Sequence, residues 1–296
     1  MENALLQTKN LTKKYGSFKA VDDVSLTIHE GDIYGLIGKN GAGKTTLMRM
    51  ILGNCIKTSG EILYNNDVLE HGRNIGSIIE SPPFYSACTA LENMRRFAIL
   101  FGGDENRIQQ ILQYVGLWEV KDKHAGKFSL GMKQRLGIGI ALLGNPRFMV
   151  LDEPTNGLDP AGINEIRELI TKLNREKGMT FFISSHMLDE LARVATKFSI
   201  LNRGRLVEEI SAKELNEKCN KRLEIYADDM QKAAKILKAH VDESAVQIKD
   251  DFIMLTSDIE NSAAFNKLLC ENGIAVSRLE LKAETLEQYF FRKVNA

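Results

Sequence analysis

Gly38-Lys39-Asn40-Gly41-Ala42-Gly43-Lys44-Thr45-Thr46 is the stretch that decides how the rest of this chain is interpreted. It matches the pattern G-x-x-x-x-G-K-[ST], in which glycines let backbone N–H groups curl around phosphates while a lysine and a hydroxyl meet phosphate and Mg²⁺. A buried apolar run at 33–37 precedes it, and 46–52 has helical spacing, so the loop is expected at a helix N-terminus. We therefore predict nucleotide binding.

The composition is that of an ordinary globular protein. The chain has 296 residues, 44% hydrophobic and 26% charged, enough for one large domain or two unequal ones. Because 39 basic residues balance 39 acidic ones, a nucleic-acid partner held by bulk charge is disfavoured. The four cysteines lack metal-ligand spacing, which predicts thiols in a reducing compartment. The N-terminus carries no signal-peptide pattern, and the longest apolar stretch, 136–143, is far shorter than the ~20 residues that span a bilayer, so we expect a cytoplasmic protein.

Two different patterns flank the loop. Alternating segments at 5–11 and 24–29 predict an antiparallel β layer. From 82 to 145 the pattern is mostly helical, with Thr89 and Glu92 spaced as a capping box. Within it, 127–135 is a polar-glycine turn that opens a helix, another arrangement that binds anions.

A second motif follows a predicted buried strand. The apolar run 148–151 ends in Asp152 and Glu153, and adjacent carboxylates at a buried strand end favour a bound cation and an activated water over a simple helix cap. The strand expected at 179–184 leads to His186. A lone histidine is more often structural, but the carboxyl end of an α/β strand is where ligands bind.

The tail contains none of these motifs. Its pattern predicts strands and helices in the order βαββαβ, a ferredoxin-like arrangement with a final helix, at 222–227, 228–241, 245–249, 252–256, 259–272, 275–281 and 285–291. Since its polar residues form no catalytic cluster, a packing or dimerisation domain is favoured over a ligand sensor.

Over residues 1 to 215 this set of motifs resembles the ATP-binding subunit of ABC transporters. The resemblance implies a P-loop ABC ATPase domain at 1–218, with a RecA-like core, an antiparallel β subdomain and a helical subdomain at about 82–145. The fold class is then α/β, followed by a small α+β domain at 219–296.

The resemblance also implies roles for particular residues, with ATP and Mg²⁺ as cofactors. Glu153 is the expected base, Lys44 and His186 meet the γ-phosphate, and Thr45, Asp152 and Glu80 surround the metal. The nucleotide-binding set comprises Tyr15 as the adenine-stacking aromatic, Gly38, Asn40, Gly41, Ala42, Gly43, Lys44, Thr45 and Thr46 as Walker A, Ser129 and Gly131 as the signature, and Asp159 as the D-loop aspartate.

Two departures from the family pattern narrow the prediction. The signature reads Phe128-Ser129-Leu130-Gly131-Met132 instead of Leu-Ser-Gly-Gly-Gln, and Glu80 stands where the family has glutamine. The chain resembles the glutamate-loop group of bacitracin and lantibiotic immunity transporters in several places. These are Glu80, the segments 81–85 and 89–93, the signature and the segment 265–274. This implies an ATPase of self-protection against antimicrobial peptides.

The resemblance implies two kinds of partner. A second copy would complete the ATP site with its Ser129 and Gly131, and integral membrane permease subunits would handle the peptide, docking near 83–93 and holding the chain on the inner face of the membrane. Alternatives are an ABC ATPase that exports another substrate and a soluble, non-transport ABC ATPase. An ABC ATPase of DNA repair would carry a long coiled-coil insertion, and an ABC ATPase of translation would carry two ATPase cassettes on one chain. The sequence shows neither feature. A regulatory module that never hydrolyses ATP would be expected to lose the base, yet Glu153 is present.

Overall fold

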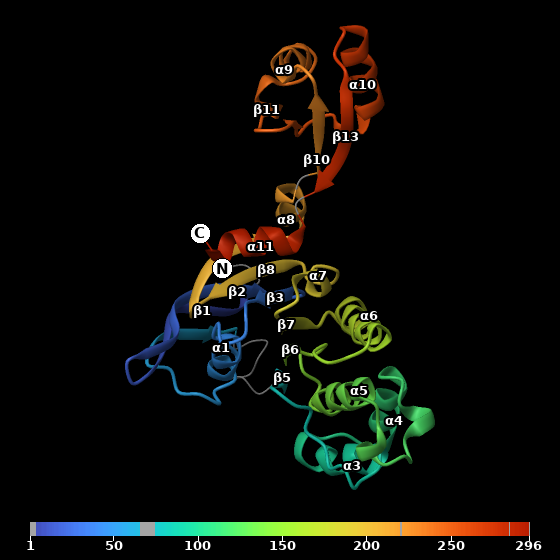
Figure 1. The fold of residues 1–296 in the computed structure, drawn as a ribbon. Helices are drawn as coiled ribbons and strands as arrows, with labels where there is room; N and C mark the ends of the chain where they lie inside the picture. Colours follow the sequence, from blue (N-terminus) through green and yellow to red (C-terminus); the bar gives the residue numbers. More distant parts are fainter. Residues whose placement is uncertain (1–3, 66–74, 220, 284, 296) are drawn as a thin grey trace. The chain divides into compact units, whose positions relative to one another are not determined.

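The computed structural model describes residues 4–65, 75–219, 221–283 and 285–295 (Figure 1). The chain divides into two compact units, Met1–Ala212 together with Lys293–Ala296, and Lys213–Arg292. The sequence predicted one boundary between 218 and 219. The structure instead divides the chain between 212 and 213 and groups the last four residues with the first unit.

A six-stranded sheet forms the centre of the first unit, in the order β5-β6-β7-β3-β8-β9. Neighbouring strands are parallel except for the antiparallel pair β8 and β9. Every residue of β3, β6 and β7 is buried, as expected for apolar strands inside a parallel sheet. The strands are β3 (Ile33–Ile37), β5 (Ile75–Ile78), β6 (Phe148–Asp152), β7 (Thr180–Ser185), β8 (Lys197–Asn202) and β9 (Arg205–Ser211).

A three-stranded antiparallel sheet, in the order β2-β1-β4, confirms the expected β layer. Its strands are β1 (Ala4–Tyr15), β2 (Phe18–His29) and β4 (Ser59–Tyr64). Helix α1 (Lys44–Ile51) joins the two sheets, because one buried cluster contains Leu6 and Ile28 from the antiparallel sheet, Leu47 from α1, and Leu36 and Phe148 from the parallel sheet.

The helical segment has the predicted character. It contains α3 (Ala90–Phe101), α4 (Glu105–Tyr114), the short 3-10 turns Trp118–Val120 and Ala125–Lys127, and α5 (Leu130–Ala141). Thr89 and Glu92 form the predicted capping box at α3. After β6 the chain forms α6 (Pro160–Lys177), which ends at Gly178 in the left-handed conformation, and a short helix α7 (Leu188–Leu191) follows β7.

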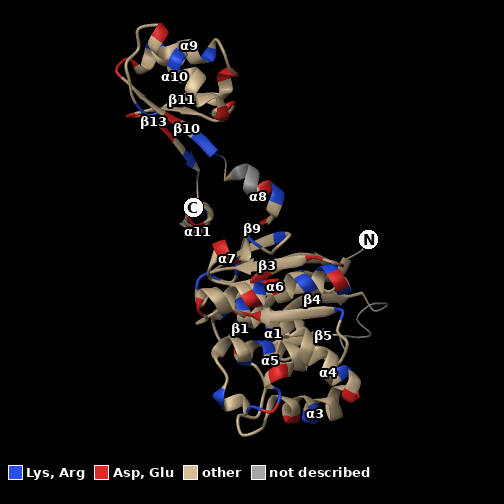
Figure 2. Ribbon diagram, turned by 90° about the vertical axis from the view of Figure 1, so that its right-hand side faces the viewer, with Lys and Arg blue, Asp and Glu red and all other residues tan. Residues whose placement is uncertain are grey.

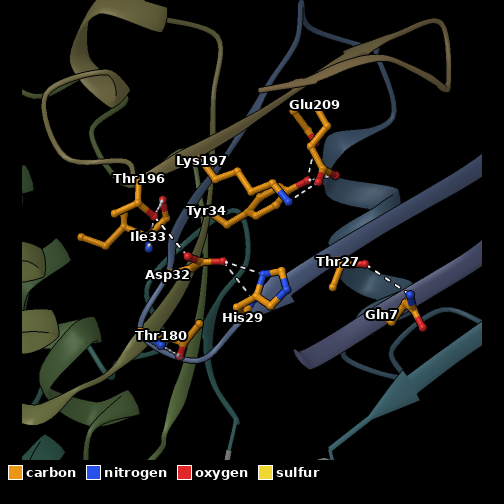
Figure 3. A network of polar contacts seen from close by, with 12 residues as sticks. Gln7, Thr27, His29, Asp32, Ile33, Tyr34, Thr180, Thr196, Lys197 and Glu209 are labelled. Carbon is orange, nitrogen blue, oxygen red and sulfur yellow. Dashed lines mark hydrogen bonds and ion pairs between the residues drawn. The ribbon is translucent and has the colours of Figure 1, made fainter. Parts of the chain in front are cut away.

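A network of polar contacts fixes β3 in the sheet (Figure 3). The Tyr34 hydroxyl donates to Glu209 Oε2 at 2.7 Å and contacts the Ser199 hydroxyl, while the Lys197 ammonium pairs with Glu209. Burial, together with the Glu209 charge, raises the pKa of Tyr34 well above its ordinary value, so the phenol stays protonated. The strand that leads into the glycine loop is therefore held at a defined position between its neighbours.

The second unit has the predicted βαββαβ order. Its antiparallel sheet is ordered β11-β12-β10-β13, the ferredoxin-like arrangement. A buried cluster that includes Leu223, Leu237 and Leu269 lies between this sheet and its two helices. The elements from the chain division onward are α8 (Ala212–Lys218), β10 (Lys221–Ala227), α9 (Met230–Lys238), β11 (Val246–Ile248), β12 (Ile253–Leu255), α10 (Ser262–Glu271), β13 (Val276–Ala283) and α11 (Leu286–Asn295). Figure 2 shows acidic and basic residues interspersed along both units.

Candidate functional site

The Walker A loop lies between the carboxyl end of β3 and the beginning of α1. Gly41 and Gly43 have φ values of 80° and 107°, a region that favours glycine. A Cβ on Gly43 would also lie 2.3 Å from the Ala20 carbonyl oxygen. The first backbone hydrogen bond of α1 runs from Leu47 N to Gly43 O, so the N–H groups of the first turn lack intrahelical acceptors and suit an anion.

Other residues of the loop make backbone contacts that fix its path. Gly38 N–H donates to the Ser185 carbonyl at 3.3 Å, which ties the loop to the end of β7, and Ala42 N–H donates to the Lys39 carbonyl at 3.0 Å. Asn40 is exposed and Thr46 half-buried. The loop is therefore shaped by its own backbone and by the neighbouring strand.

Lys44 is buried, and its ammonium lies inside the loop. Nζ donates to the Gly38 carbonyl at 2.7 Å and the Lys39 carbonyl at 3.4 Å, and it lies 3.0 Å from Glu153 Oε1. A phosphate bound at this lysine and the Glu153 carboxylate compete for the same ammonium. The affinity for nucleotide is thus coupled to the position of the Glu153 carboxylate.

Asp152, at the end of β6, is buried and receives two hydroxyl hydrogen bonds. Thr45 Oγ1 donates to Oδ2 at 2.7 Å and Ser184 Oγ donates to Oδ1 at 2.6 Å. The structure therefore brings together the Walker A hydroxyl and the carboxylate that the sequence assigned to Mg²⁺. Ser184 was missed from the sequence; its only signal was a polar residue at the end of a buried strand.

Glu153 lies between Lys44 and His186. His186 Nδ1 is 2.6 Å from Glu153 Oε2, and the Glu153 N–H donates to Ser184 Oγ at 2.9 Å. Glu153 has φ 50°, a left-handed conformation that is uncommon outside glycine and is often found at functional sites. Its carboxylate is thus held at the carboxyl edge of the parallel sheet, where ligands bind in such folds.

The oxygen ligands around Asp152 fit Mg²⁺. A hydroxyl and carboxylates are hard donors, and Mg²⁺ in nucleotide sites takes one or two carboxylates, several waters and the substrate phosphates. Among the described residues no cluster of three or more His, Cys, Asp or Glu could hold a metal ion alone. One hydroxyl and the neighbouring carboxylates suit a Mg²⁺ ion that takes its other ligands from water and phosphate.

Tyr15 lies at the end of β1 and has 54% of its surface exposed. Its hydroxyl is 3.5 Å from Cys55 Sγ, and Lys13 Nζ lies 4.8 Å from the ring centroid. The hydrogen bond with Cys55 raises the pKa of the phenol. The ring is exposed enough to stack on a base, and its role toward adenine stays a prediction.

Ser129, Gly131 and Asp159 lie at the beginnings of two helices. Ser129 caps α5 by accepting from Met132 N at 3.2 Å, and Asp159 caps α6 by accepting from Gly162 N at 3.1 Å. A Cβ on Gly131 would lie 3.7 Å from the Gly162 Cα, so the two helix starts adjoin. Within one chain the structure does not bring the beginning of α5 to the beginning of α1 (Figure 1).

Glu80 directly follows the segment that contains β5 and has φ 65°. Its Oε1 accepts from Arg49 Nη2 at 2.7 Å, and Arg49 lies in the last turn of α1. The structure thus joins Glu80 to the helix that begins at Walker A. No sequence signal pointed to Arg49, because it lies outside the nucleotide-binding motifs.

The fold and the site define a P-loop nucleotide-binding protein with a helical insertion between its phosphate loop and its paired carboxylates. The chain belongs to the ATP-binding proteins of ABC transporters, a family of ATP-hydrolysing enzymes whose members work with membrane permeases and form dimers. The family model described as ABC transporter matches residues 21–156.

Two curated relatives are similar over different shares of the chain. The bacitracin transport ATP-binding protein BcrA of Bacillus licheniformis is 42% identical, and the alignment covers 99% of this chain and 98% of that protein. The lantibiotic transport ATP-binding protein SrtF of Streptococcus pyogenes is 43% identical and covers 69% of this chain and 90% of that protein.

Two solved structures each cover about seven tenths of the chain. A nucleotide-free ATP-binding cassette from an ABC transporter has a TM-score of 0.65 and 28% identity, covering 71% of this chain and 92% of that one. A dimeric ATP-binding cassette in a post-hydrolysis state, bound to ADP and Pi, has a TM-score of 0.61 and 27% identity. The match covers 70% of this chain and 99% of that one. No helix in the part of the chain that the structure describes is long and apolar enough to cross a membrane.

Proposed function

We propose that this chain is the ATP-hydrolysing subunit of an exporter that protects its cell against a bacitracin- or lantibiotic-type peptide. The observation that carries the proposal is similarity over nearly the whole chain, tail included, to the bacitracin transport ATP-binding proteins of Bacillus licheniformis and Enterococcus faecalis, at 42% and 39% identity. Glu80, in place of the usual glutamine, supports the same group.

The site residues divide the chemistry among them. Lys44 binds the β- and γ-phosphates, and Thr45 and Asp152 hold Mg²⁺, which when bound neutralises charge on the phosphate oxygens. Glu153 orients the attacking water and accepts its proton, and His186 keeps the Glu153 carboxylate in place and donates to the γ-phosphate. Glu80 lies at the edge of this site, and Tyr15 stacks on the adenine.

Two copies complete the site. In this proposal Ser129 and Gly131 of a second copy cover the triphosphate that Walker A holds, and Asp159 lies beside them at the start of α6. Support comes from the separation of α5 from α1 within one chain and from the similar dimeric cassette. Separation of the copies after hydrolysis would reset the transporter.

The segment 83–93, which follows Glu80 after two residues, is the proposed docking surface for the permease. Tyr85 of this segment is exposed and packs against Phe97, with ring centroids 6.0 Å apart. The buried Asn93 fixes the segment, accepting from Tyr85 N at 2.7 Å and donating to the Tyr85 carbonyl at 3.0 Å. Because this shaped surface follows Glu80 closely in the chain, movement at the nucleotide site can reach the permease, which would hold the chain on the inner face of the membrane.

The test is the survival, under challenge with bacitracin or a lantibiotic, of cells that express the chain together with integral membrane permease subunits. We expect protection against bacitracin or a lantibiotic, loss of protection with Glu153→Gln, and co-purification of the chain with an integral membrane subunit. ATP hydrolysis without protection against either class would overturn the peptide assignment and leave an ABC ATPase that exports another substrate.

A further inference from the structure

We propose that Arg49 is a positioning residue that neutralises Glu80 and thereby lets a carboxylate stand where related ATPases carry a neutral glutamine. The inference rests on the nucleotide site proposed above and adds a residue to it. Its basis is the geometry of one ion pair, between the last turn of α1 and the residue that lies just before the docking segment.

Arg49 connects three parts of the site. Its Nη2 lies 2.7 Å from Glu80 Oε1, and it is on the same helix that begins with Lys44. Its backbone carbonyl accepts from Cys55 N at 3.1 Å, and the Cys55 thiol contacts the Tyr15 hydroxyl. Arg49 is also near enough to Tyr15 for its positive charge to oppose the rise in the phenol pKa that the hydrogen bond to Cys55 causes.

The pair addresses an electrostatic problem at this position. A glutamine is neutral, whereas Glu80 adds a negative charge after the end of β5, next to the end of β6 where the triphosphate site is proposed, and like charges repel. A guanidinium remains charged throughout the physiological pH range and holds a carboxylate in a defined orientation. With Arg49 in contact, the Glu80 oxygen remains a hard ligand for Mg²⁺ or its water, while the net charge of the pair is zero.

If the ion pair had a purely structural role, removing Arg49 or Glu80 would have different effects from those expected for charge neutralisation. The Arg49 and Glu80 side chains are 43% and 64% exposed, and exposed ion pairs contribute little to folding stability. If the pair served only to fasten the loop, removing either partner would have similar, small effects. If the pair serves charge neutralisation, removing Arg49 is harmful only while Glu80 keeps its charge.

The experiment is a double-mutant cycle read by nucleotide affinity. Calorimetry with AMP-PNP and Mg²⁺ gives Kd for the unmodified chain, Arg49→Ala, Glu80→Gln and the double variant, and thermal unfolding checks the fold. We expect Arg49→Ala to raise Kd about fivefold or more, roughly 1 kcal/mol. Glu80→Gln should lower Kd because Arg49 is then an uncompensated cation, and the double variant should return to within about twofold of the unmodified chain.

Matched controls come from the same chain. Arg95 and Glu105 form an ion pair with the same 2.7 Å separation and 52% and 64% exposure in the helical segment, so Arg95→Ala should leave Kd unchanged. ADP, which lacks the γ-phosphate, should show a smaller effect of Arg49→Ala than AMP-PNP. Arg49→Lys, which keeps the charge, should recover most of the affinity.

Two outcomes overturn the inference. Either Arg49→Ala binds AMP-PNP like the unmodified chain, or the double variant binds as weakly as Arg49→Ala, which would mean that Arg49 acts independently of Glu80. Failure of the proposed function has a different signature. In that case the unmodified chain binds no AMP-PNP, and the nucleotide site and this inference fall together.

Discussion

Glu153 is the residue on which the separate parts of the site converge. It contacts Lys44 from the Walker A loop and His186 from the end of β7, and its backbone bonds to Ser184. The Walker A loop and the end of β7 therefore meet at one carboxylate. The first prediction concerns that group.

Glu153→Gln should retain ATP binding but lose nearly all turnover. The amide keeps the shape but is a poor base, and loss of a general base costs about 10²- to 10⁴-fold in rate. It also removes the charge that competes with phosphate for Lys44. Phosphate release and size-exclusion chromatography with ATP test this, and we expect a trapped dimer. Only monomer together with unimpaired hydrolysis would refute the assignment.

Lys44→Ala should weaken nucleotide binding itself. Hydrogen bonds to charged groups contribute about 1.5–3 kcal/mol, so Kd should rise roughly 10- to 100-fold. Calorimetry with AMP-PNP measures the change, and Lys177→Ala, at the end of α6, is the control for the loss of a lysine. An unchanged Kd for Lys44→Ala would contradict the role of the loop.

The sequence predicted the site residues that belong to motifs, and the structure brings five of them together. Lys44, Thr45, Asp152, Glu153 and His186 could be predicted because each follows the end of a buried strand or opens α1. Ser184 could not, since its contact with Asp152 depends on the pairing of those two residues between β6 and β7, and strand register is not visible in a motif. Arg49 was missed for a similar reason, because its partner lies 31 positions away.

At the scale of elements, the extent of β1 shows why strand boundaries were hard to predict. Sequence alternation predicted a strand at 5–11, whereas β1 covers Ala4–Tyr15. Its pairing with β2 shifts register between Thr8 and Leu11, and Asn10 there has φ 48°. Such irregularities break the two-residue alternation on which the prediction depended, so the continuation of the strand is hidden.

The segment after Glu80 is expected to transmit ATP-dependent movement, which gives the third prediction. Glu80→Ala should reduce peptide protection more than it reduces hydrolysis by the purified subunit, because the chain continues from Glu80 through two residues to the proposed docking surface at 83–93. Hydrolysis assays beside survival of cells challenged with a lantibiotic test this. Full protection with Glu80→Ala would contradict the prediction, and Glu105→Ala in the helical segment is the control carboxylate.

The sheet of the second unit contains a buried carboxylate whose charge stabilises the fold. Glu224 is 1% exposed and accepts hydrogen bonds from Arg222 and Tyr226, with Lys282 Nζ at 3.0 Å. Burial alone would raise the pKa of this carboxyl, but these partners outweigh burial and hold the pKa below its ordinary 4.5.

The fourth prediction follows from the sign of that shift. Since the native carboxyl binds a proton less readily than the unfolded one, it contributes stability at neutral pH that is lost as the pH falls from about 4.5 through the lowered pKa. Glu224→Gln should therefore lower the Tm at pH 7, and the difference from the unmodified chain should narrow in acid. Calorimetric scans between pH 7 and pH 3 measure this Tm difference. A difference in Tm that does not change with pH would show that the charge of Glu224 contributes nothing to stability.

At the scale of the whole molecule, the sequence predicted two units and the ferredoxin-like order of the second, but not the return of the chain to the first. Lys293 pairs with Glu208 at 3.4 Å, and Asn202 Nδ2 donates to the Val294 carbonyl at 3.0 Å. Both partners lie on β8 or β9, and neither contact has a local sequence signal. The helical pattern at 285–291 predicted a helix without indicating which unit its last residues would join.

The last prediction concerns whether the C-terminal residues that contact β8 and β9 stabilise the first unit. Deleting residues 293–296 removes the contacts of Lys293 and Val294 with β9 and β8, which together contribute on the order of 1 kcal/mol, so the first unit should unfold about 2–4 °C lower. Asn202→Ala should produce part of the same fall, because it removes only the donor to the Val294 carbonyl. AMP-PNP affinity should stay within about twofold, since none of the residues that bind the phosphates is touched. Differential scanning calorimetry beside nucleotide titration separates the two effects, and an unchanged Tm for the deletion would mean that the returning residues do not stabilise the first unit.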